Sequence, residues 1–357
     1  MIKIYGSKIC GDCIDCLKAF DKKGIGYEFI DINSDLKLFK EFLKYRDNSS
    51  VFEICKKEGY IGIPAIVSED GSVTIDWEKY LEEYSTQEQK VEPEKSLKKP
   101  LTKKDLSEAF KELGLKENDI VMVHASLSSL GYVCGGAQAV IEAIIETVGD
   151  SGSIMMPTQS WKNLDPDVGV HWDVDRKYWQ IIRDNWPAYN KKITPTNTMG
   201  AVAEMFRLWD GTIRSEHPTR SFAAWGKEAK YLVKDHELSN IFGENSPLDK
   251  LYKLDGKVLL IGVGYDKNTS MHLADAMAKY PGKHNTLEHS AVMEDGKRVW
   301  KAYETLYVDG EDFTKIGEAF EGEHSVHKTT IGDCELRLMS QRTLVDFAIG
   351  WIEKNRK

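Results

Sequence analysis

The sequence lacks the features of a membrane, secreted or nucleic-acid-binding protein. No run of about 18 apolar residues occurs in its 357 residues, so no membrane-spanning helix is expected. The N-terminal MIKIYGSKIC has no apolar core followed by a small-residue cleavage site. The formal net charge of -9 has the wrong sign for attraction to nucleic acid or to an anionic membrane. We therefore expect a cytoplasmic protein with neither of these as its main partner.

Cysteine and histidine are scarce and unevenly placed. Four of the six cysteines occur before residue 56, and the first of the nine histidines is His124. Six cysteines in a chain of this length do not form the disulfide framework of a small secreted protein. We therefore expect the cysteines to be reduced or to take part in chemistry.

One polar segment, referred to below as the seam, divides the chain into two parts. Residues 84–100, YSTQEQKVEPEKSLKKP, contain many charges, two prolines and almost nothing apolar. Such a segment cannot bury enough surface to offset the entropy of ordering it, so we interpret it as a linker. The sequence thus predicts a small domain at residues 1–83 and a larger domain at residues 101–357.

The residues before the seam alternate between strand and helix patterns. The sequence predicts strands at IKIYG and YEFIDI, a helix at CIDCLKAFDKKG that ends at Gly24, and a helix at SDLKLFKEFLKYRDN with Ser34 as its N-cap. PAIVSEDGSVTI predicts a hairpin with Asp70-Gly71 at its turn. This order indicates a small α/β domain.

Cys10 and Cys13 lie where the first strand passes into the first helix. The free N–H groups and positive dipole of a helix N-terminus stabilise a thiolate at Cys10, and Cys13, one turn further, is placed to resolve a mixed disulfide. Three interpretations stay open: dithiol redox chemistry, inert buried thiols, and zinc held by Cys10, Cys13 and Cys16 with one further ligand. Because zinc sites usually draw ligands from two separated segments, we expect no metal.

The first domain resembles the glutaredoxin family. IYGSKICGDC matches the family's strand, loop and CxxC helix, YEFIDI its second strand, and GYIGIPAIV its segment with a cis-proline beside the sulfurs. The resemblance implies a thioredoxin/glutaredoxin-like fold for residues 1–83. It also implies that Cys10 is the attacking thiol, that Pro64 is the cis residue, and that glutathione or another thiol is a partner.

The residues after the seam predict a larger α/β domain. TKKDLSEAFKELGLKENDI shows helical periodicity after a Thr cap. DIVMVHAS, GSIMMPT and GKVLLIGVG are apolar runs that alternate with helical patterns. Strands that are apolar throughout are typical of a sheet covered on both faces, so we expect a central parallel or mixed sheet.

A Ser- and Gly-rich loop follows the first strand of the larger domain. In DIVMVHASLSSLGYVCGGAQAVI, His124 lies near the end of a buried strand, and the loop that follows leads into a helix. Glycines let backbone N–H groups approach a ligand, and a helix N-terminus favours an anion. No Lys follows the glycines, so this is not a P-loop. On the residues alone, Ser126, Ser128 and Gly135-Gly136 indicate either a linear or anionic ligand or a plain strand–turn–helix with capping serines.

Two further polar segments follow apolar strands. GTIRSEHPTRSFAAWG places His217 in a turn that Pro218 stiffens, and LLIGVGYDKNTSMHLAD brings His272 and Asp275 after a glycine turn. In α/β proteins, the ligand-binding site usually lies among polar groups beyond the carboxyl ends of the strands. A lone histidine is more often structural than catalytic, so the residues alone leave the role of His217 open.

Taken together, these segments resemble the aminoglycoside 3-N-acetyltransferase family, an acetyl-CoA-dependent group distinct from the GNAT fold. The matching segments are HASLSSLGYVCGGAQAVI, GSIMMPTQSW, ITPTNTMGAVAEMFR, IRSEHPTRSFAAWG, NSPLDKL, LLIGVGYDKNTSMHLAD and IGDCELRLMSQRTLVDFAIGWI, in family order from about residue 101 to the end. The resemblance implies a larger α/β domain with a central mixed sheet.

The resemblance also implies roles for individual residues. The pantetheine and phosphate end of CoA would lie along His124, Ser126, Leu127, Ser128, Val133, Gly135 and Gly136. His217 would be the general base that accepts a proton from the attacking amine, with Glu204 or Asp275 orienting it. Direct attack of the amine on the thioester needs no cysteine or serine nucleophile.

The acceptor pocket is expected in the loop SWKNLDPDVGVHWDVD. Enzymes acting on aminoglycosides need carboxylates to hold polycationic sugars, and Asp165 and Asp167, with His272, are the candidates. A solvated acidic loop is the equal alternative.

Three functions follow. The leading one is acetyl-CoA-dependent acetylation of an aminoglycoside, at the 3-N position, or of a related small-molecule amine. The alternative is a glutaredoxin-type oxidoreductase with a CoA-binding but catalytically degenerate second domain. The third makes the first domain a binding or dimer-forming module for the transferase, which leaves a homodimer open.

Overall fold

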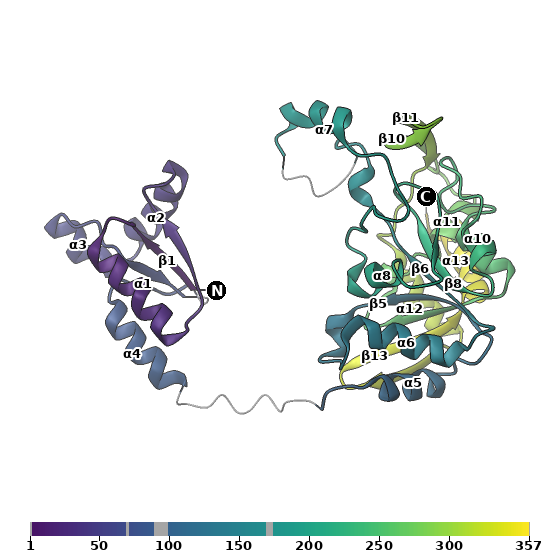
Figure 1. Ribbon diagram of the computed structural model, residues 1–357, viewed down its shortest axis with the longest axis horizontal. Coiled ribbons are helices and arrows are strands. Elements are labelled where there is room, and N and C mark those ends of the chain that lie inside the picture. The colour runs from purple at the N-terminus through teal and green to yellow at the C-terminus, as the bar shows by residue number, and fades with distance from the viewer. Residues whose placement is uncertain (1, 69–70, 89–98, 169–173, 357) are drawn as a thin grey trace. The chain divides into compact units, whose positions relative to one another are not determined.

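The computed structural model describes residues 2–68, 71–88, 99–168 and 174–356. The chain forms two compact units, Met1–Leu97 and Lys98–Lys357, which are described separately (Figure 1). Helix α4 (Trp77–Glu88) continues through residues 84–88 of the predicted linker, so the helical part of the first unit ends later than predicted. The rest of that segment, up to residue 98, lies outside the described residues. Within the described residues, none of the helices is long and apolar enough to cross a membrane.

The N-terminal unit is built on a sheet with the strand order β2-β1-β3-β4. Strand β1 is parallel to β2 and antiparallel to β3, which pairs in turn with β4 as the predicted hairpin. Asp70 of the predicted turn lies outside the described residues. The bounds are β1 Ile2–Gly6, β2 Tyr27–Asp31, β3 Ala65–Val67 and β4 Val73–Thr74, with helices α1 Gly11–Lys23, α2 Leu36–Asn48 and α3 Glu53–Glu58.

Local signals set the ends of these helices. Helix α1 ends at Gly24, which adopts φ 69° as its C-cap, as predicted. Helix α2 begins one residue later than predicted: the side chain of Asp35, not Ser34, accepts from the N–H of Lys37 as the N-cap. The prediction failed because Ser34 and Asp35 are both good caps, and Ser34 instead donates its hydroxyl to the Asp31 carbonyl. The Ile63–Pro64 peptide bond is cis, as predicted.

The sheet of the N-terminal unit buries apolar side chains on both faces. Ile4, Cys16 and Phe20 pack with Leu81 of α4 on one face. Tyr5, Ile30 and Phe42 form the core on the other face, against α2. The helix that carries the cysteines is thus fixed to the sheet by Cys16 and Phe20.

The C-terminal unit contains a sheet that, in the described part of the chain, has seven strands in the order β12-β13-β9-β5-β6-β8-β7. Its centre is parallel: β5 pairs in parallel with both β6 and β9. The outer strands pair antiparallel, which confirms a mixed sheet. The bounds are β5 Ile120–Ala125, β6 Ser153–Pro157, β7 Ile213–Arg214, β8 Phe222–Gly226, β9 Lys257–Ile261, β12 His327–Ile331 and β13 Cys334–Ser340.

Alternate residues of the central strands enter two different cores. Val121 and Val123 of β5 pack on one face with α5 and α6, whereas Met122 packs on the opposite face. Burial of both faces explains why these strands are apolar throughout. Helices α5 Lys103–Glu112, α6 Gly136–Val148 and α8 Gly200–Phe206 cover the first face, and α9 Ala229–Val233, α10 Pro247–Lys253, α11 Met271–Met277, α12 Phe313–Glu323 and α13 Gln341–Asn355 cover the second.

A long hairpin stands apart from this sheet and is not among the predicted elements. Strands β10 (Asn285–Glu294) and β11 (Lys297–Leu306) pair with each other over ten residues. The hairpin lies at the same end of the unit as the short helix α7 (Trp179–Asn185), and Arg298 of β11 donates to the carbonyls of Arg183 and Trp186 (Figure 1). It places Glu288 and Tyr303 beside the predicted His–Pro turn.

Candidate active site

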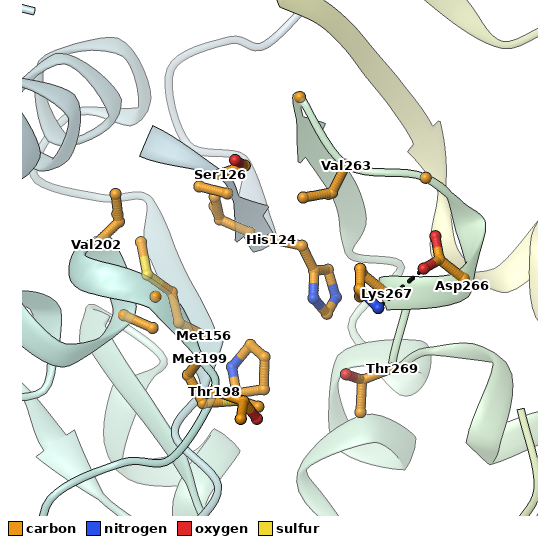
Figure 2. A pocket seen from close by; sticks show the side chains of 17 residues that line it. His124, Ser126, Met156, Thr198, Met199, Val202, Val263, Asp266, Lys267 and Thr269 are labelled. Carbon is orange, nitrogen blue, oxygen red and sulfur yellow. Dashed lines mark ion pairs between the residues drawn. The ribbon is translucent and has the colours of Figure 1, made fainter. Parts of the chain in front are cut away.

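A cavity of about 420 Å³ opens where the central parallel strands end. Its lining includes His124 and Ser126 at the end of β5, Met156 and Pro157 at the end of β6, and Gly262–Gly264 after β9. Thr198, Met199 and Val202 lie beside Met156 and face Val263, Asp266 and Lys267 across the cavity (Figure 2). Parallel strands present their carboxyl ends at one edge of a sheet, which is where α/β proteins bind ligands. The cavity therefore lies where the sequence predicted the site.

His124 is the buried polar group of this cavity. Its ring points into the cavity beside the Asp266–Lys267 ion pair (Figure 2), and its Nε2 is buried without a hydrogen-bond partner among the described residues. Burial lowers the pKa of His124 to about 3, so the ring is neutral at physiological pH. A neutral imidazole with a free nitrogen is suited to a hydrogen bond with an uncharged ligand group.

The predicted serine loop is ordered by its own hydroxyls. Ser126 Oγ lies 3.1 Å from Ser128 Oγ and accepts from Ser129 Oγ at 2.8 Å. Gly262 has φ 60°, and a Cβ there would lie 2.3 Å from the Cβ of Ser129, so only glycine allows this loop to pack on the end of β9.

The remaining residues predicted for CoA lie outside the cavity wall. Leu127 and Ser128 form a short 3-10 helix after Ser126, and Val133 is buried in a bridge to Leu101. Gly135 is the N-cap of α6, with φ 87°, and Gly136 is its first residue. The structure therefore brings His124 and Ser126 together in the cavity, while the other five extend the same loop toward the start of α6.

His217 lies in the predicted turn and is fully buried. The turn runs beside the segment that follows β6: Thr158 N–H donates to the Ser221 carbonyl, and Ser160 N–H donates to the Thr219 carbonyl, both at 2.9 Å. Since Pro157, the last residue of β6, lines the cavity, the turn and the cavity share one edge of the sheet.

Backbone groups fix the orientation of the His217 ring. Nδ1 accepts from the N–H groups of Thr219 at 3.2 Å and Arg220 at 3.1 Å, and Nε2 makes no hydrogen bond with the described residues. Burial, with the neighbouring His236 and Arg220, holds the pKa of His217 well below its ordinary value. The neutral ring therefore carries its proton on Nε2, because Nδ1 acts as an acceptor.

Neither acid predicted to orient His217 contacts it. Glu204 accepts from Thr196 and forms an ion pair with Arg207. Burial raises the pKa of its carboxyl, but these hydrogen bonds outweigh burial and bring it to about 2. Asp275 is fully buried against Arg356, with Tyr280 at 3.3 Å. The prediction was wrong on this point because both carboxylates have arginine partners that neutralise them.

The buried acid near the turn is Glu288 of the hairpin. Arg220 forms a two-pronged ion pair with it, at 2.6 and 3.1 Å, and the side chains of both residues are at most 5% exposed. Tyr303 donates to Glu288 at 3.3 Å and meets the His217 ring edge to face, with the ring centroids 6.1 Å apart. Sequence reasoning missed Glu288; the available signal was a lone acid among the mostly uncharged residues of NTLEHSAV.

A second buried arginine ties together the segments around the turn. Arg214 donates to the Ser221 hydroxyl at 3.0 Å, to the Ser160 hydroxyl at 2.9 Å and to the carbonyls of Thr158 and Thr194. None of these four acceptors is a carboxylate, and the Tyr189 ring lies against the guanidinium, with its centroid 5.3 Å from Cζ. Arg214 thus joins the segment after β6 to the end of the His–Pro turn.

His272 lies away from the cavity wall. Its ring stacks on Phe242, with centroids 4.8 Å apart, and contacts Phe313 at 4.7 Å. Nδ1 lies 3.4 Å from the carboxylate of Asp275. In this arrangement His272 packs against aromatic rings, and its prediction as a substrate-binding residue stays a prediction.

The two aspartates predicted to bind the acceptor are paired with arginines. Arg183 holds Asp165 with two hydrogen bonds of 2.8 Å and also contacts Asp167, which pairs in addition with Arg176 at 2.9 Å. Arg183 outweighs the effect of burial and lowers the pKa of Asp165. Both carboxylates therefore already have cationic partners, whereas the prediction had them binding the ammonium groups of an acceptor.

The predicted thiols of the N-terminal unit lie as expected at the start of α1. Cys10 is the half-buried N-cap, and its Sγ accepts from the N–H of Cys13 at 3.4 Å. Burial, together with the hydrogen bond to Cys10, raises the pKa of Cys13, and burial raises that of Cys16 to about 12. Among the described residues, no three His, Cys, Asp or Glu side chains gather in an arrangement that could hold a metal.

The chain is thus an α/β protein with a cavity at the carboxyl edge of a mixed sheet, and the buried, neutral His124 and His217 lie at that edge. The sequence model of the aminoglycoside 3-N-acetyltransferase family matches residues 122–353. The chain belongs to this family of acetyl-CoA-dependent enzymes and is an acyltransferase.

Relatives support this assignment over most of their length. The chain is 42% identical to the SPbeta prophage-derived aminoglycoside N(3')-acetyltransferase-like protein YokD of Bacillus subtilis, over 72% of this chain and 94% of the relative. It is 33% identical to aminoglycoside N(3)-acetyltransferase VII of Streptomyces paromomycinus, over 71% and 92% respectively.

Solved structures show the same fold. The crystal structure of YokD aligns with a TM-score of 0.69 at 42% identity, covering 73% of this chain and 96% of that one. The enzyme AAC-VIa bound to sisomicin aligns with a TM-score of 0.66 at 29% identity, covering 72% and 99%. AAC-IIIb in a binary complex with CoASH aligns with a TM-score of 0.65 at 26% identity, covering 72% and 98%.

Proposed function

We propose that residues 98–357 transfer the acetyl group of acetyl-CoA to an amine of an aminoglycoside, at the 3-N position, or of a related amine-bearing small molecule. The family membership supports the reaction class, and the aminoglycoside acetyltransferases among the relatives support the acceptor. The observation that carries the proposal is His217, buried and neutral in a fixed turn at the sheet edge that also holds the cavity.

The residues at the cavity fit the thioester end of acetyl-CoA. Val123, Met156 and Val202 provide an apolar wall for the pantetheine arm, and Ser126 and the free Nε2 of His124 offer polar contacts for its amides. A cavity of about 420 Å³ suits this end of the molecule, with the rest lying along the loop toward α6. Acetyl-CoA supplies the activated acyl group.

His217 can serve this reaction in one of two ways. As a general base it must present a nitrogen without a proton, and in the described orientation that nitrogen is Nδ1, which the two backbone N–H groups occupy. A turn of the ring about its Cβ–Cγ bond would release Nδ1 for the amine. Without that turn, Nε2–H donates a hydrogen bond to the oxygen on which charge develops. We propose the base role, since an ammonium must lose a proton before it attacks.

Two substitutions separate these roles. His217→Gln places an amide where Nε2 lies, so it can donate a hydrogen bond but cannot accept a proton, whereas His217→Ala can do neither. If His217 is the base, both variants lose roughly 100-fold or more in kcat with little change in CoA affinity. If Gln retains most of the activity that Ala loses, the base role is wrong and His217 is a donor. Calorimetry with CoA confirms that each variant still binds the co-substrate.

We propose that the N-terminal unit is glutaredoxin-like and carries out thiol–disulfide exchange with glutathione or another thiol. Cys10 is half-buried at the N-cap of a helix, whereas Cys13 is buried and held as a thiol. The Cys10 thiolate attacks a mixed disulfide and releases one thiol. Cys13 then gives up its proton and displaces the second thiol, which leaves a Cys10–Cys13 disulfide. The strand order β2-β1-β3-β4 and the cis Ile63–Pro64 bond agree with the resemblance of this unit.

Reduction of a glutathione mixed disulfide by the full chain tests this second proposal. Cys10→Ser should abolish the reaction, and Cys16→Ser, which removes a buried thiol of the same helix, is the matched control. Equal reduction by the Cys10→Ser protein would refute it. A cytoplasmic location, a homodimer and the exact domain limits stay predictions.

A further inference from the structure

One ion pair lies on the wall of the cavity. Asp266 and Lys267 both line the cavity, and among the described residues of its lining they carry the only carboxylate and the only ammonium group. Asp266 Oδ2 lies 2.9 Å from Lys267 Nζ, and the two side chains are 48% and 67% exposed. Ion pairs as exposed as this one contribute little to stability, so an incoming cation can replace Lys267 with little loss.

The fold holds the carboxylate of Asp266 at the cavity. Asp266 belongs to the short 3-10 helix Tyr265–Lys267, which follows the glycines at the end of β9. A Cβ on Gly264 would lie 2.7 Å from Asp266 Oδ1, so the carboxylate is folded back over a residue that itself lines the cavity. The pair lies beside the ring of His124 (Figure 2), which burial keeps neutral by lowering its pKa to about 3. His124 therefore adds no positive charge that would compete for this carboxylate.

An acceptor that reacts at this cavity must place its amine close to the thioester. Attack requires the nitrogen to come within about 3–3.5 Å of the thioester carbon. The proposed function assigns the thioester end of acetyl-CoA to the cavity, so the groups next to the attacking amine lie at the same wall. In an acceptor with several amino groups these include further ammonium groups, which leave water only for a compensating charge.

On the basis of the proposed function, we propose that Asp266 binds a second ammonium group of the acceptor, and that Lys267 occupies this ammonium subsite while the acceptor is absent. Binding then exchanges one ion pair for another: the ammonium group of Lys267 moves into water, and that of the acceptor takes its place on the carboxylate. An acceptor with a single amino group has nothing to place in this subsite and gains no affinity from Asp266.

Calorimetry with kanamycin, a polycationic aminoglycoside, and the full chain in the presence of CoA tests this inference. Asp266→Asn should weaken kanamycin binding by about 10-fold or more, because one charge-assisted contact is lost. Lys267→Met should strengthen it by about 2- to 5-fold, because the competing cation is gone, whereas Lys267→Arg, which keeps the pair, should not. Asp255→Asn is the matched control: Asp255 forms an exposed pair with Arg342 at 3.6 Å and precedes β9, at the opposite edge of the sheet.

Glucosamine, which has one amino group, should bind the wild-type and Asp266→Asn proteins equally. Kanamycin binding that is absent from the wild type, or unchanged in Asp266→Asn, would overturn the inference. Weaker CoA binding by Lys267→Met with unchanged kanamycin binding would also overturn it, because Lys267 would then contact a phosphate of CoA. The proposed function fails in a different way: a protein whose binding follows the expected pattern would yield no acetylated amine.

Discussion

Acidification should destabilise the C-terminal unit alone. His124, His217 and His236 are buried and neutral: burial lowers the pKa of His124 to about 3 and that of His236 to about 4, and holds that of His217 well below its ordinary value. An unfolded histidine binds a proton below about pH 6.5. Because the unfolded state then binds more protons than the folded state, the free energy of unfolding falls as the pH falls below 6.5.

The expected loss is large. At pH 5, 1.5 units below the unfolded value, His124 and His236 each lower the free energy of unfolding by about 2 kcal/mol relative to pH 7.5. These two residues give about 4 kcal/mol, a large part of the roughly 5–15 kcal/mol that stabilises a typical domain, and His217 adds to the loss in the same direction. For a unit of this size, the loss from His124 and His236 corresponds to a fall in melting temperature of roughly 8–16 °C.

Calorimetry of the full chain at pH 7.5 and pH 5 measures this effect with an internal control. Residues 1–97 contain no histidine, so the transition of the N-terminal unit should move little while that of the C-terminal unit falls. His236→Gln should remove about 2 kcal/mol of the pH dependence, and His284→Gln, at an exposed position, is its control. A C-terminal transition that is equally stable at both pH values would refute the burial of neutral histidines.

Three further predictions follow from single contacts. Arg214→Lys should lower kcat by roughly 10- to 100-fold in steady-state assays with the KM for acetyl-CoA nearly unchanged, since a lysine cannot hold the turn with a planar fork of donors. Gly262→Ala should weaken CoA binding by about 10-fold or more in calorimetry, because the added Cβ would collide with Ser129. Arg356→Ala should cost about 3–5 kcal/mol in urea unfolding, since it leaves the buried Asp275 carboxylate without its main partner; a loss below 1 kcal/mol would show that the pair contributes little.

The strands of the sheet could be predicted from the sequence, because burial on both faces makes each central strand a run of apolar residues. The apolar runs of β5, β6 and β9 identify the strands, and Gly24 and Thr102 mark helix ends through their own backbone or side-chain chemistry. Because His124 and Ser126 stand at the end of one such run, their position at the carboxyl edge of the sheet, where the cavity lies, could also be predicted.

The partners of the charged groups could not be predicted in this way. Arg220 meets Glu288 across 68 residues, through a hairpin whose position depends on tertiary packing. Asp165 is neutralised by Arg183 from a separate helix. A carboxylate in the sequence shows that a charge exists, but only the fold shows which cation cancels it, so Glu204 and Asp275 were assigned to the wrong partner.

We propose that residues 98–357 pass an acetyl group from CoA to an amine with the help of His217. Mass spectrometry of the acceptor after incubation with acetyl-CoA tests it most directly, and avoids thiol reagents that would also react with the exposed Cys134. We expect one acetylated amine for each CoA released by the wild-type protein, and loss of the product with His217→Ala. Acetylated amine formed equally by both proteins, or no product from a wild-type protein that binds CoA across a broad panel of amines, would contradict it.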